Sequence, residues 1–341
     1  MDVARLPKQL ALRVSTAREV GLPAPAPVGL ALLAACIFLT VGSLASDTFA
    51  EHTVSGLAAG GVYGSLALSL VLIYRATEVI NFAQGAMAMF TTYIAWQLLH
   101  WGLPYWGAFF ATLGIAFFGG ITLERVVIRP VEHRSVLTVV VVTIGLVFVI
   151  QGVATWIWAS DLRGFPSAFP TRPIRVGGVV FSLQDLGTIG VSIGAVVVLW
   201  LFFQFTKTGL AMRAAALRPA AARLVGVRVS WMLALGWGLA AVLGAIAGLM
   251  IAPTAVSGGI QPTFMDLYLI YAFAAAVLGG IESPAGAVVG GLLLGVLLDL
   301  LTTYVNFVTS EIRFSVALGL LLAVLVIRPS GLFGRAAVKR V

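Results

Sequence analysis

The stretch VLTVVVVTIGLVFVIQGVATWIW, residues 136–158, decides the fold class, because it is long, apolar and free of charged side chains. A helix of about 20 apolar residues spans the ~30 Å hydrocarbon core of a bilayer. Comparable apolar runs lie near residues 27–46, 54–74, 82–99, 104–127, 187–205, 231–252, 266–281, 286–307 and 312–328. The sequence therefore predicts an all-α, polytopic helical membrane protein of about ten transmembrane segments.

The overall composition agrees with a membrane protein. Of the 341 residues, 60% are hydrophobic and only 10% are charged, which leaves too little polar surface for a soluble fold. The net charge of +8 comes from Lys and Arg residues in short segments between apolar runs, so it indicates membrane topology and not nucleic-acid binding. The single cysteine, Cys36, and three scattered histidines predict neither a disulfide framework nor a metal site.

The distribution of positive charge predicts the orientation. Of the 21 Lys and Arg residues, 17 fall on one side of a ten-span arrangement and 4 on the other, and cytoplasmic loops are the ones that retain positive charge. Both termini are therefore expected in the cytoplasm, with residues 1–26 as an N-terminal segment, 27–328 as the transmembrane domain and 329–341 as a tail. We interpret 27–46 as a retained span and not as a signal peptide, although SLAS at 43–46 resembles a cleavage site.

Two loops stand out from the apolar pattern. The exported loop 160–186 is rich in Pro and Gly and ends in β-branched residues, which predicts a loop or small hairpin, either a connector or a contact for an extracytoplasmic partner. The inner loop 207–230 contains MRAAALRPAAARLVGV at 212–227. Pro219 suits the first position of a helix and Gly226 is a natural stop, so a helix of about two turns is expected from Pro219 to Val225.

Glycines at intervals of four predict close helix packing, because small residues let helix backbones approach. One stripe is Gly56, Gly60 and Gly64, and a second is formed by Gly286, Gly290, Gly291 and Gly295. The sequence Gly279-Gly280, followed by Ser283-Pro284, also suggests a broken or re-entrant span. Such breaks are tolerated where protein or a watery cavity satisfies the backbone.

A second break lies in YRATEVINFAQGAMAMF, residues 74–90. Glu78, Asn81 and Gln84 are spaced by three, so they are able to share one face of a helix. Buried polar groups in a membrane domain commonly face a pathway, but an exposed inner loop explains these residues equally well. The candidate substrate-pathway residues are Asn81, Phe82, Gln84, Gly85, Gly279 and Gly280.

Four sequence elements together resemble the permeases of branched-chain amino acid importers. INFAQG (80–85) is similar to the family's INFAHG element, with Gln84 in place of the usual histidine. AAVLGGIESPAGAVVGGLLLG (275–295) is similar to a glycine-rich family element, with Glu282 in place of a glycine. ERVVIRP (124–130) and IRPSGLFG (327–334) resemble a cytoplasmic element and the C-terminal tail. The resemblance covers about residues 54–334.

The resemblance implies one membrane subunit of an ATP-binding-cassette importer in the bacterial cytoplasmic (inner) membrane. Its implied partners are a second homologous permease or a second copy, two cytoplasmic ATPases and an extracytoplasmic substrate-binding protein. The inner loop would be the segment that couples to an ATPase, through Arg213, Ala214, Arg218, Pro219, Ala222, Arg223 and Gly226. Related permeases carry urea, short amides or small organic acids, so the substrate stays open.

No phosphate-binding loop of the form G-x-x-x-x-G-K-[ST] occurs in the sequence. We therefore expect a transport subunit and not an enzyme, with no cofactor of its own and with ATP and Mg used by partner chains. An ion-coupled secondary transporter is the main alternative. It would carry ionisable groups near mid-membrane, but Glu78, Asp266 and Glu282 fall near predicted span ends or breaks and only Asp299 does not, which weakens this alternative. An intramembrane enzyme is a third class, but no nucleophile–base pair or H-E-x-x-H motif is present.

Overall fold

A computed structural model describes residues 47–132, 134–170, 172–176, 179–255, 258–305, 309, 312–328 and 330–334. The predicted apolar segment 27–46 and the predicted cytoplasmic segment 1–26 lie outside these residues. The helices and strands are α3 (Asp47–Thr77), α4 (Gln84–His100), α5 (Tyr105–Leu123), α6 (Val136–Trp158), β1 (Pro173–Val176), β2 (Val179–Ser182), α7 (Leu183–Phe205), α8 (Lys207–Leu217), α9 (Pro219–Leu224), α10 (Val229–Ile251), α11 (Phe264–Gly279), α12 (Pro284–Tyr304) and α13 (Arg313–Ile327). A π-helical turn (Glu124–Ile128) follows α5 and a 3₁₀ turn (Ala252–Thr254) follows α10.

The helical membrane fold is confirmed. Each apolar run predicted between residues 54 and 328 corresponds to a helix, namely α3 to α7 and α10 to α13. In the described part of the chain, six helices are long and apolar enough to cross a membrane, and α11 and α13 are shorter apolar helices. The exact number of full spans within the predicted ten stays a prediction.

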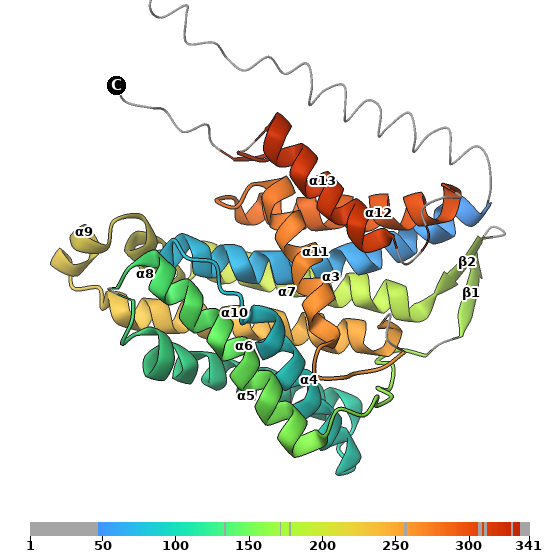
Figure 1. Cartoon of the computed structure of the whole chain (residues 1–341), viewed down its shortest axis with the longest axis horizontal. Coiled ribbons are helices and arrows are strands. Elements are labelled where there is room, and N and C mark those ends of the chain that lie inside the picture. The colour runs from blue at the N-terminus through green and yellow to red at the C-terminus, as the bar shows by residue number, and fades with distance from the viewer. Residues whose placement is uncertain are drawn as a thin grey trace, which may run out of the picture. The chain divides into compact units, whose positions relative to one another are not determined.

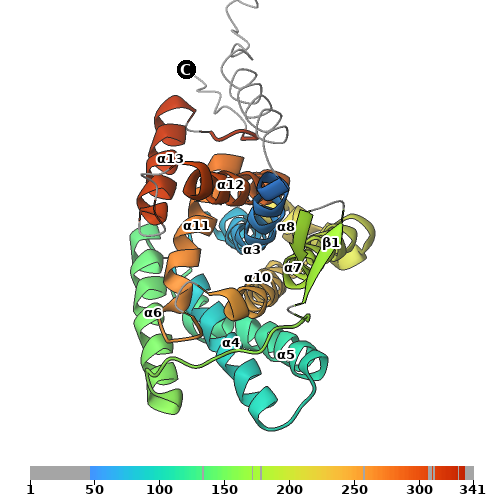
Figure 2. The same cartoon turned by 90° about the vertical axis from the view of Figure 1, so that its right-hand side faces the viewer.

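Two helices form the centre of the bundle. In α3 and α10, 83% of the most apolar window is buried inside the protein, whereas in α6 and α7 the share is 17%. Figure 2, in which α3 and α10 are seen nearly end-on, shows α3 in the middle with α7, α10, α11 and α12 around it. The outer helices α6 and α7 therefore present most of their apolar side chains to the surroundings, as expected for a protein whose solvent is lipid.

The two glycine stripes meet at the contact between α3 and α12. A Cβ atom added to Gly60 would lie 2.8 Å from the carbonyl oxygen of Gly291, and one added to Gly64 would lie 3.1 Å from that of Val288. A Cβ atom on Gly291 would overlap the backbone of Gly64. The predicted packing role of these glycines is confirmed, because the two backbones touch where a side chain would stand.

Helix α4 begins halfway across the bundle. Helix α3 ends at Thr77, because Glu78 has a positive φ of 57° and residues 78–83 continue without helix. The Thr77 hydroxyl donates a hydrogen bond to the Ile73 carbonyl at 2.9 Å and accepts one from Val79 N at 3.3 Å. The prediction that Glu78, Asn81 and Gln84 share one helical face was therefore wrong, since Glu78 and Asn81 lie on the connection between the two helices and Gln84 is the first residue of α4.

The predicted broken span at Gly279-Gly280 is a tight turn between two separate helices. Gly280 has a φ of 103°, a conformation that glycine adopts without strain, and Ser283 Oγ accepts a hydrogen bond from Gly286 N at the start of α12. The C-terminal residues pack on this turn, where Leu332 N donates to the Leu278 carbonyl at 2.8 Å and Phe333 N donates to that of Gly279 at 3.0 Å. Two sequence elements of the family resemblance thus lie against each other.

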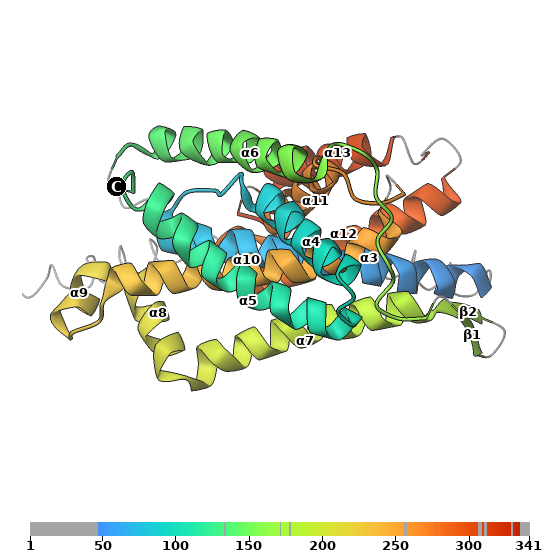
Figure 3. The ribbon, with the colours of Figure 1, turned by 90° about the horizontal axis from the view of Figure 1, so that it is seen from below.

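The two loops lie at opposite ends of the bundle (Figures 1 and 3). At one end β1 and β2 form an antiparallel pair with Pro173 opposite Ser182, which confirms the predicted hairpin. Helix α7 begins at Leu183, so the loop is shorter than the predicted 160–186. At the other end, the inner loop 207–230 contains two helices, α8 and α9, where only α9 was predicted.

Candidate functional site

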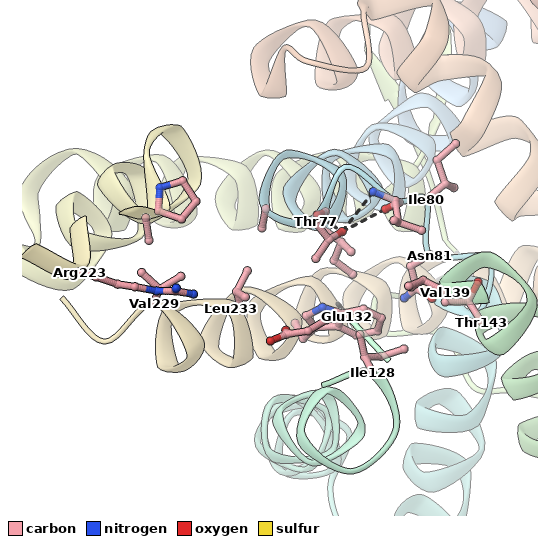
Figure 4. A pocket seen from close by; sticks show the side chains of 16 residues that line it. Thr77, Ile80, Asn81, Ile128, Glu132, Val139, Thr143, Arg223, Val229 and Leu233 are labelled. Carbon is pink, nitrogen blue, oxygen red and sulfur yellow. Dashed lines mark hydrogen bonds between the residues drawn. The ribbon is translucent and has the colours of Figure 1, made fainter. Parts of the chain in front are cut away.

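A cavity of about 200 Å³ extends from α9 into the bundle (Figure 4). Pro219 and Arg223 of α9 line one end, and Asn81 and Thr143 lie at the other. The wall between them is mainly apolar, with side chains from α3, the π-helical turn, α6 and α10. The structure therefore brings a residue from the predicted pathway and residues from the predicted coupling segment into one cavity.

Asn81 is held in place by its own neighbours. Its side chain is 1% exposed, its Oδ1 accepts a hydrogen bond from Ala83 N at 3.0 Å, and its Nδ2 donates to Gln84 Oε1 at 3.3 Å. The first contact is a turn in which an Asn side chain replaces a backbone acceptor, a common role for this residue. Asn81 thus places an amide in the cavity wall on a fixed, non-helical connection.

Gln84 has a different position, although it is only three residues further on. It is fully buried, its Nε2 donates to the main-chain carbonyl of Ala240 at 2.8 Å, and it is not among the residues that line the cavity. A Cβ atom on Gly244 would lie 2.7 Å from this Nε2 atom. The lack of a side chain at Gly244 of α10 therefore leaves room for the Gln84 amide. Gln84 therefore ties the start of α4 to α10.

The remaining predicted pathway residues are not gathered in the cavity. Phe82 is 37% exposed, and Gly85 lies against Met265 and Leu269 of α11. Gly279 and Gly280 belong to the turn between α11 and α12. The structure accounts for both glycines by close packing, and a pathway role for these four residues stays a prediction.

The residues of the predicted coupling segment divide among different surroundings. Helix α9 runs from Pro219 to Leu224, one residue shorter than predicted, and ends before Gly226, which has a φ of 83°. Arg218 precedes the helix without a side-chain cap, as expected, and is exposed. Ala222 is buried against α8 and the start of α10, and Ala214 packs on the same cluster. Arg213 lies on α8, where its Nη1 donates to Gln204 Oε1 at 3.4 Å.

Sequence reasoning missed two polar residues of the cavity. Glu132 and Arg223 extend toward each other from opposite sides of it, and Thr143 faces Asn81 (Figure 4). Glu132 lies two residues after the element ERVVIRP, and Thr143 is a hydroxyl within the apolar run 136–158. Both polar residues are visible in the sequence, but nothing in the sequence shows that the segments around Glu132 and Thr143 border the same cavity as α9.

Two polar groups beside the cavity lack hydrogen-bond partners among the described residues. Both carboxylate oxygens of Glu124 are buried without one, in a π-helical turn whose last residue, Ile128, lines the cavity. Trp237 also lines the cavity, and its Nε1 is buried without an acceptor. Single π-helical turns are frequent at functional sites, and a buried polar group left unpaired costs stability. Of the two, Trp237 lines the cavity, so water or a polar solute there would supply the missing acceptor for its Nε1.

The cavity combines a few polar groups with an apolar wall. Among the described residues, its lining contains an amide, two threonine hydroxyls, one carboxylate, one guanidinium and one indole on a mainly aliphatic wall, and no His, Cys or Ser. A solute with charges of both signs and an apolar part matches this set of groups. No member of the lining pairs a nucleophile with a base.

Comparisons with known proteins agree with this description. Residues 52–327 match the family described as "Branched-chain amino acid transport system / permease component". The chain is 30% identical to the high-affinity branched-chain amino acid transport system permease protein LivH of Salmonella typhimurium, over 86% of this chain and 98% of that protein. It is 31% identical to the corresponding permease BraD of Pseudomonas aeruginosa, with the same shares covered.

Among solved structures, PsaBC from Streptococcus pneumoniae in complex with Fab matches with a TM-score of 0.45 and 15% identity, over 86% of this chain and 97% of that one. The family match covers most of the described helices, from α3 to α13. The chain belongs to the family of permease components of branched-chain amino acid transport systems, which are multi-pass proteins of the cytoplasmic (inner) membrane.

Proposed function

We propose that this chain is the permease subunit of an ATP-binding-cassette importer for branched-chain amino acids. The proposal rests on the cavity that is lined both by Asn81 and by residues of α9. In this proposal the cavity is part of the path of the solute, and α9 belongs to the segment that the partner ATPases would move. Relatives named as branched-chain amino acid permeases align over 86% of the chain and support the substrate class.

The chemistry of the cavity supports an amino-acid substrate. A branched-chain amino acid has an ammonium group, a carboxylate and an aliphatic side chain. Glu132 and Arg223 offer one charge of each sign, Asn81 and Thr143 offer neutral hydrogen-bonding groups, and the aliphatic wall suits the side chain. A small number of placed polar groups on an apolar surface is the usual composition of a small-molecule site.

Transport needs an energy source outside this chain. We propose that two cytoplasmic ATPases use ATP and Mg, that this chain binds no cofactor, and that α8 and α9 carry ATPase movement into the bundle. A rigid-body shift of α9 would move Arg223 and Pro219, and so would change the inner end of the cavity. Such shifts of packed elements are a common form of switching.

The other end of the protein is proposed to meet further partners. The hairpin β1–β2 lies opposite α9 and is suited to contact a loaded substrate-binding protein. A second permease subunit, homologous or identical, would complete the pathway. The outer helix α6, with Val141, Phe148 and Val149 exposed, is a face that lipid or the second permease would cover.

Uptake of radiolabelled leucine by the reconstituted transporter tests the proposal. We expect leucine, isoleucine and valine to compete for uptake, and urea, acetamide and acetate to compete weakly. The same vesicles with Asn81→Leu in this chain should show lower uptake at unchanged subunit composition. Preferred transport of urea, short amides or organic acids would assign the chain to another substrate class within the family.

A further inference from the structure

A second, larger space lies on the side of the bundle formed by α3, α7, α8, α10 and α12. It is a groove of about 560 Å³ with a mostly apolar lining that includes Leu72, Trp200 and Met232. The charged members of its lining are Arg75 and Arg213. None of the residues assigned to the substrate pathway lines this groove, so it is separate from the cavity described above, although Ala76, Ala215 and Leu233 border both.

The charges and the apolar surface are arranged along the depth of the membrane. Arg75 is in the last turn of α3, and Arg213 is on α8, which begins two residues after α7 ends at Phe205. On α7 the lining extends back to Val196, nine residues before that end, which corresponds to about 14 Å of helix. The groove therefore has a basic mouth at the inner-loop end and an apolar interior.

We propose that this groove holds one acyl chain of an anionic phospholipid of the inner leaflet, with the lipid phosphate at Arg75 and Arg213. A planar guanidinium matches a phosphate group with paired N–H donors, and basic residues beside the cytoplasmic leaflet attract anionic lipids. The positive-inside distribution of Lys and Arg places α8 at that leaflet. The two arginines at the mouth thus suit the phosphate group of a phospholipid, and the apolar interior of the groove suits its acyl chain.

The size of the groove favours an acyl chain over a helix. A 20-residue helix of ~10 Å diameter and ~30 Å length fills more than about 2,000 Å³, so the groove would hold only part of it. Because the surrounding solvent is already apolar, burial of the acyl chain adds little affinity in a bilayer. Selectivity would therefore rest with the two arginines, and the lipid is expected to be chosen by its head-group charge.

Such a lipid would link the inner loop to the central helices. Arg213 is on α8, Arg75 ends α3, and Pro284 and Val288 of α12 form the opposite wall. Arg213 Nη1 donates a hydrogen bond to Gln204 Oε1 at 3.4 Å, which is long and therefore weak. The lipid would contact α8 from the membrane side and stabilise its position, while α9 faces the cytoplasm.

Retention of lipid during purification tests the proposal. The full chain, with the subunits that copurify, is taken from vesicles of equal parts phosphatidylglycerol and phosphatidylcholine and analysed by native mass spectrometry. We expect phosphatidylglycerol to be retained by the wild type. In Arg75→Gln/Arg213→Gln its retention should fall by roughly 25-fold, the product of about fivefold for each arginine, with phosphatidylcholine unchanged. Arg218→Gln, which removes an exposed arginine of the same loop, is the matched control and should behave as wild type.

A groove-filling variant keeps the test informative if the double variant does not assemble. Val289 lines the groove and is 37% exposed, so Val289→Trp should be tolerated and should reduce retained phosphatidylglycerol. Equal retention by the wild type and the variants would overturn the proposal. So would a cross-link between Val289→Cys and the single native cysteine, Cys36, because it would show that the apolar segment 27–46 covers the groove. Cys36→Ser in the same background is the control.

Discussion

The side-chain amide of Gln84 donates a hydrogen bond to the carbonyl oxygen of Ala240 at 2.8 Å, and Ala240 is the central residue of α10, which runs from Val229 to Ile251. Helix α4 therefore starts at about half the depth of the bundle. The connection from Glu78 to Ala83 returns from the end of α3 to that depth, and it carries Asn81 into the cavity. A non-helical connection at this depth is tolerated because protein and cavity surround it.

Asn81 in this connection and Gln84 at the start of α4 are expected to respond differently to substitution. Gln84→Leu leaves the Ala240 carbonyl without its side-chain donor in a buried site, and an unsatisfied buried group costs about 1–3 kcal/mol. It should lower the melting temperature of the purified protein. Asn81→Leu also removes the buried acceptor of Ala83 N, so it should lower the melting temperature as well. In addition, it should lower leucine uptake by the assembled transporter by roughly fivefold, the effect of one lost hydrogen bond. Normal leucine uptake by assembled Asn81→Leu protein, or an equal loss of uptake by assembled Gln84→Leu protein, would contradict this assignment.

One carbon atom added at the contact between α3 and α12 should lower the stability of the protein. In Gly291→Ala the new Cβ atom would overlap Gly64, and overpacking of this kind costs about 1–3 kcal/mol. Thermal unfolding in detergent should show a clear loss of stability. Gly319→Ala on α13 is the control, since no atom lies within 4 Å of the added Cβ atom and alanine favours a helix. Equal stability of the two variants would show that the two backbones do not meet as described.

Opposite charges across the cavity should matter for coupling. Arg223→Glu places a second carboxylate in the cavity that Glu132 lines, and uptake per ATP hydrolysed should fall by roughly two- to fivefold, the range for interactions between partly exposed charges. Adding Glu132→Arg should restore much of the loss. Arg218→Glu is exposed outside the cavity, so Glu132→Arg should not rescue it. Rescue of both variants alike would indicate a general effect of loop charge.

The hydrogen bond between α6 and α11 is expected to be structural. Gln151 Nε2 donates to the two carboxylate oxygens of Asp266 at 3.0 and 3.1 Å. Asp266→Asn removes a charged acceptor, and we expect a loss of up to about 2 kcal/mol in stability while uptake keeps its dependence on ATP. Uptake by the wild type that rises with an imposed proton gradient, and that Asp266→Asn abolishes, would instead make this carboxylate an ion-coupling group.

Much of the helical architecture follows from the sequence because its signals are local. Apolar runs of about 20 residues predict the helices, and the spacing of Gly56, Gly60 and Gly64 predicts a packing face. Pro219 and Gly226 predict the bounds of α9 to within one residue. Helix α8 was missed because its composition is mixed. The stripe on α12 was recognised as a second packing face, but only the fold shows that it meets the first.

The site was less predictable because it depends on contacts between distant segments. The spacing of Glu78, Asn81 and Gln84 fits a helix, and the positive φ of Glu78, which breaks that helix, has no clear signal in a non-glycine residue. Glu132 and Arg223 are more than 90 residues apart, and no periodicity relates them. Gly279 and Gly280 were assigned to the pathway because glycines occur both in tight turns and beside cavities, and the sequence alone does not distinguish the two.

ATP-dependent uptake in reconstituted vesicles tests the central claim most directly. Vesicles contain this chain, its partner permease and the two ATPases, with loaded substrate-binding protein outside and ATP inside. We expect leucine to accumulate, and accumulation to cease when the ATPases lack their catalytic residue or are omitted. Accumulation by this chain alone on a proton or sodium gradient, with no ATPase present, would contradict the account.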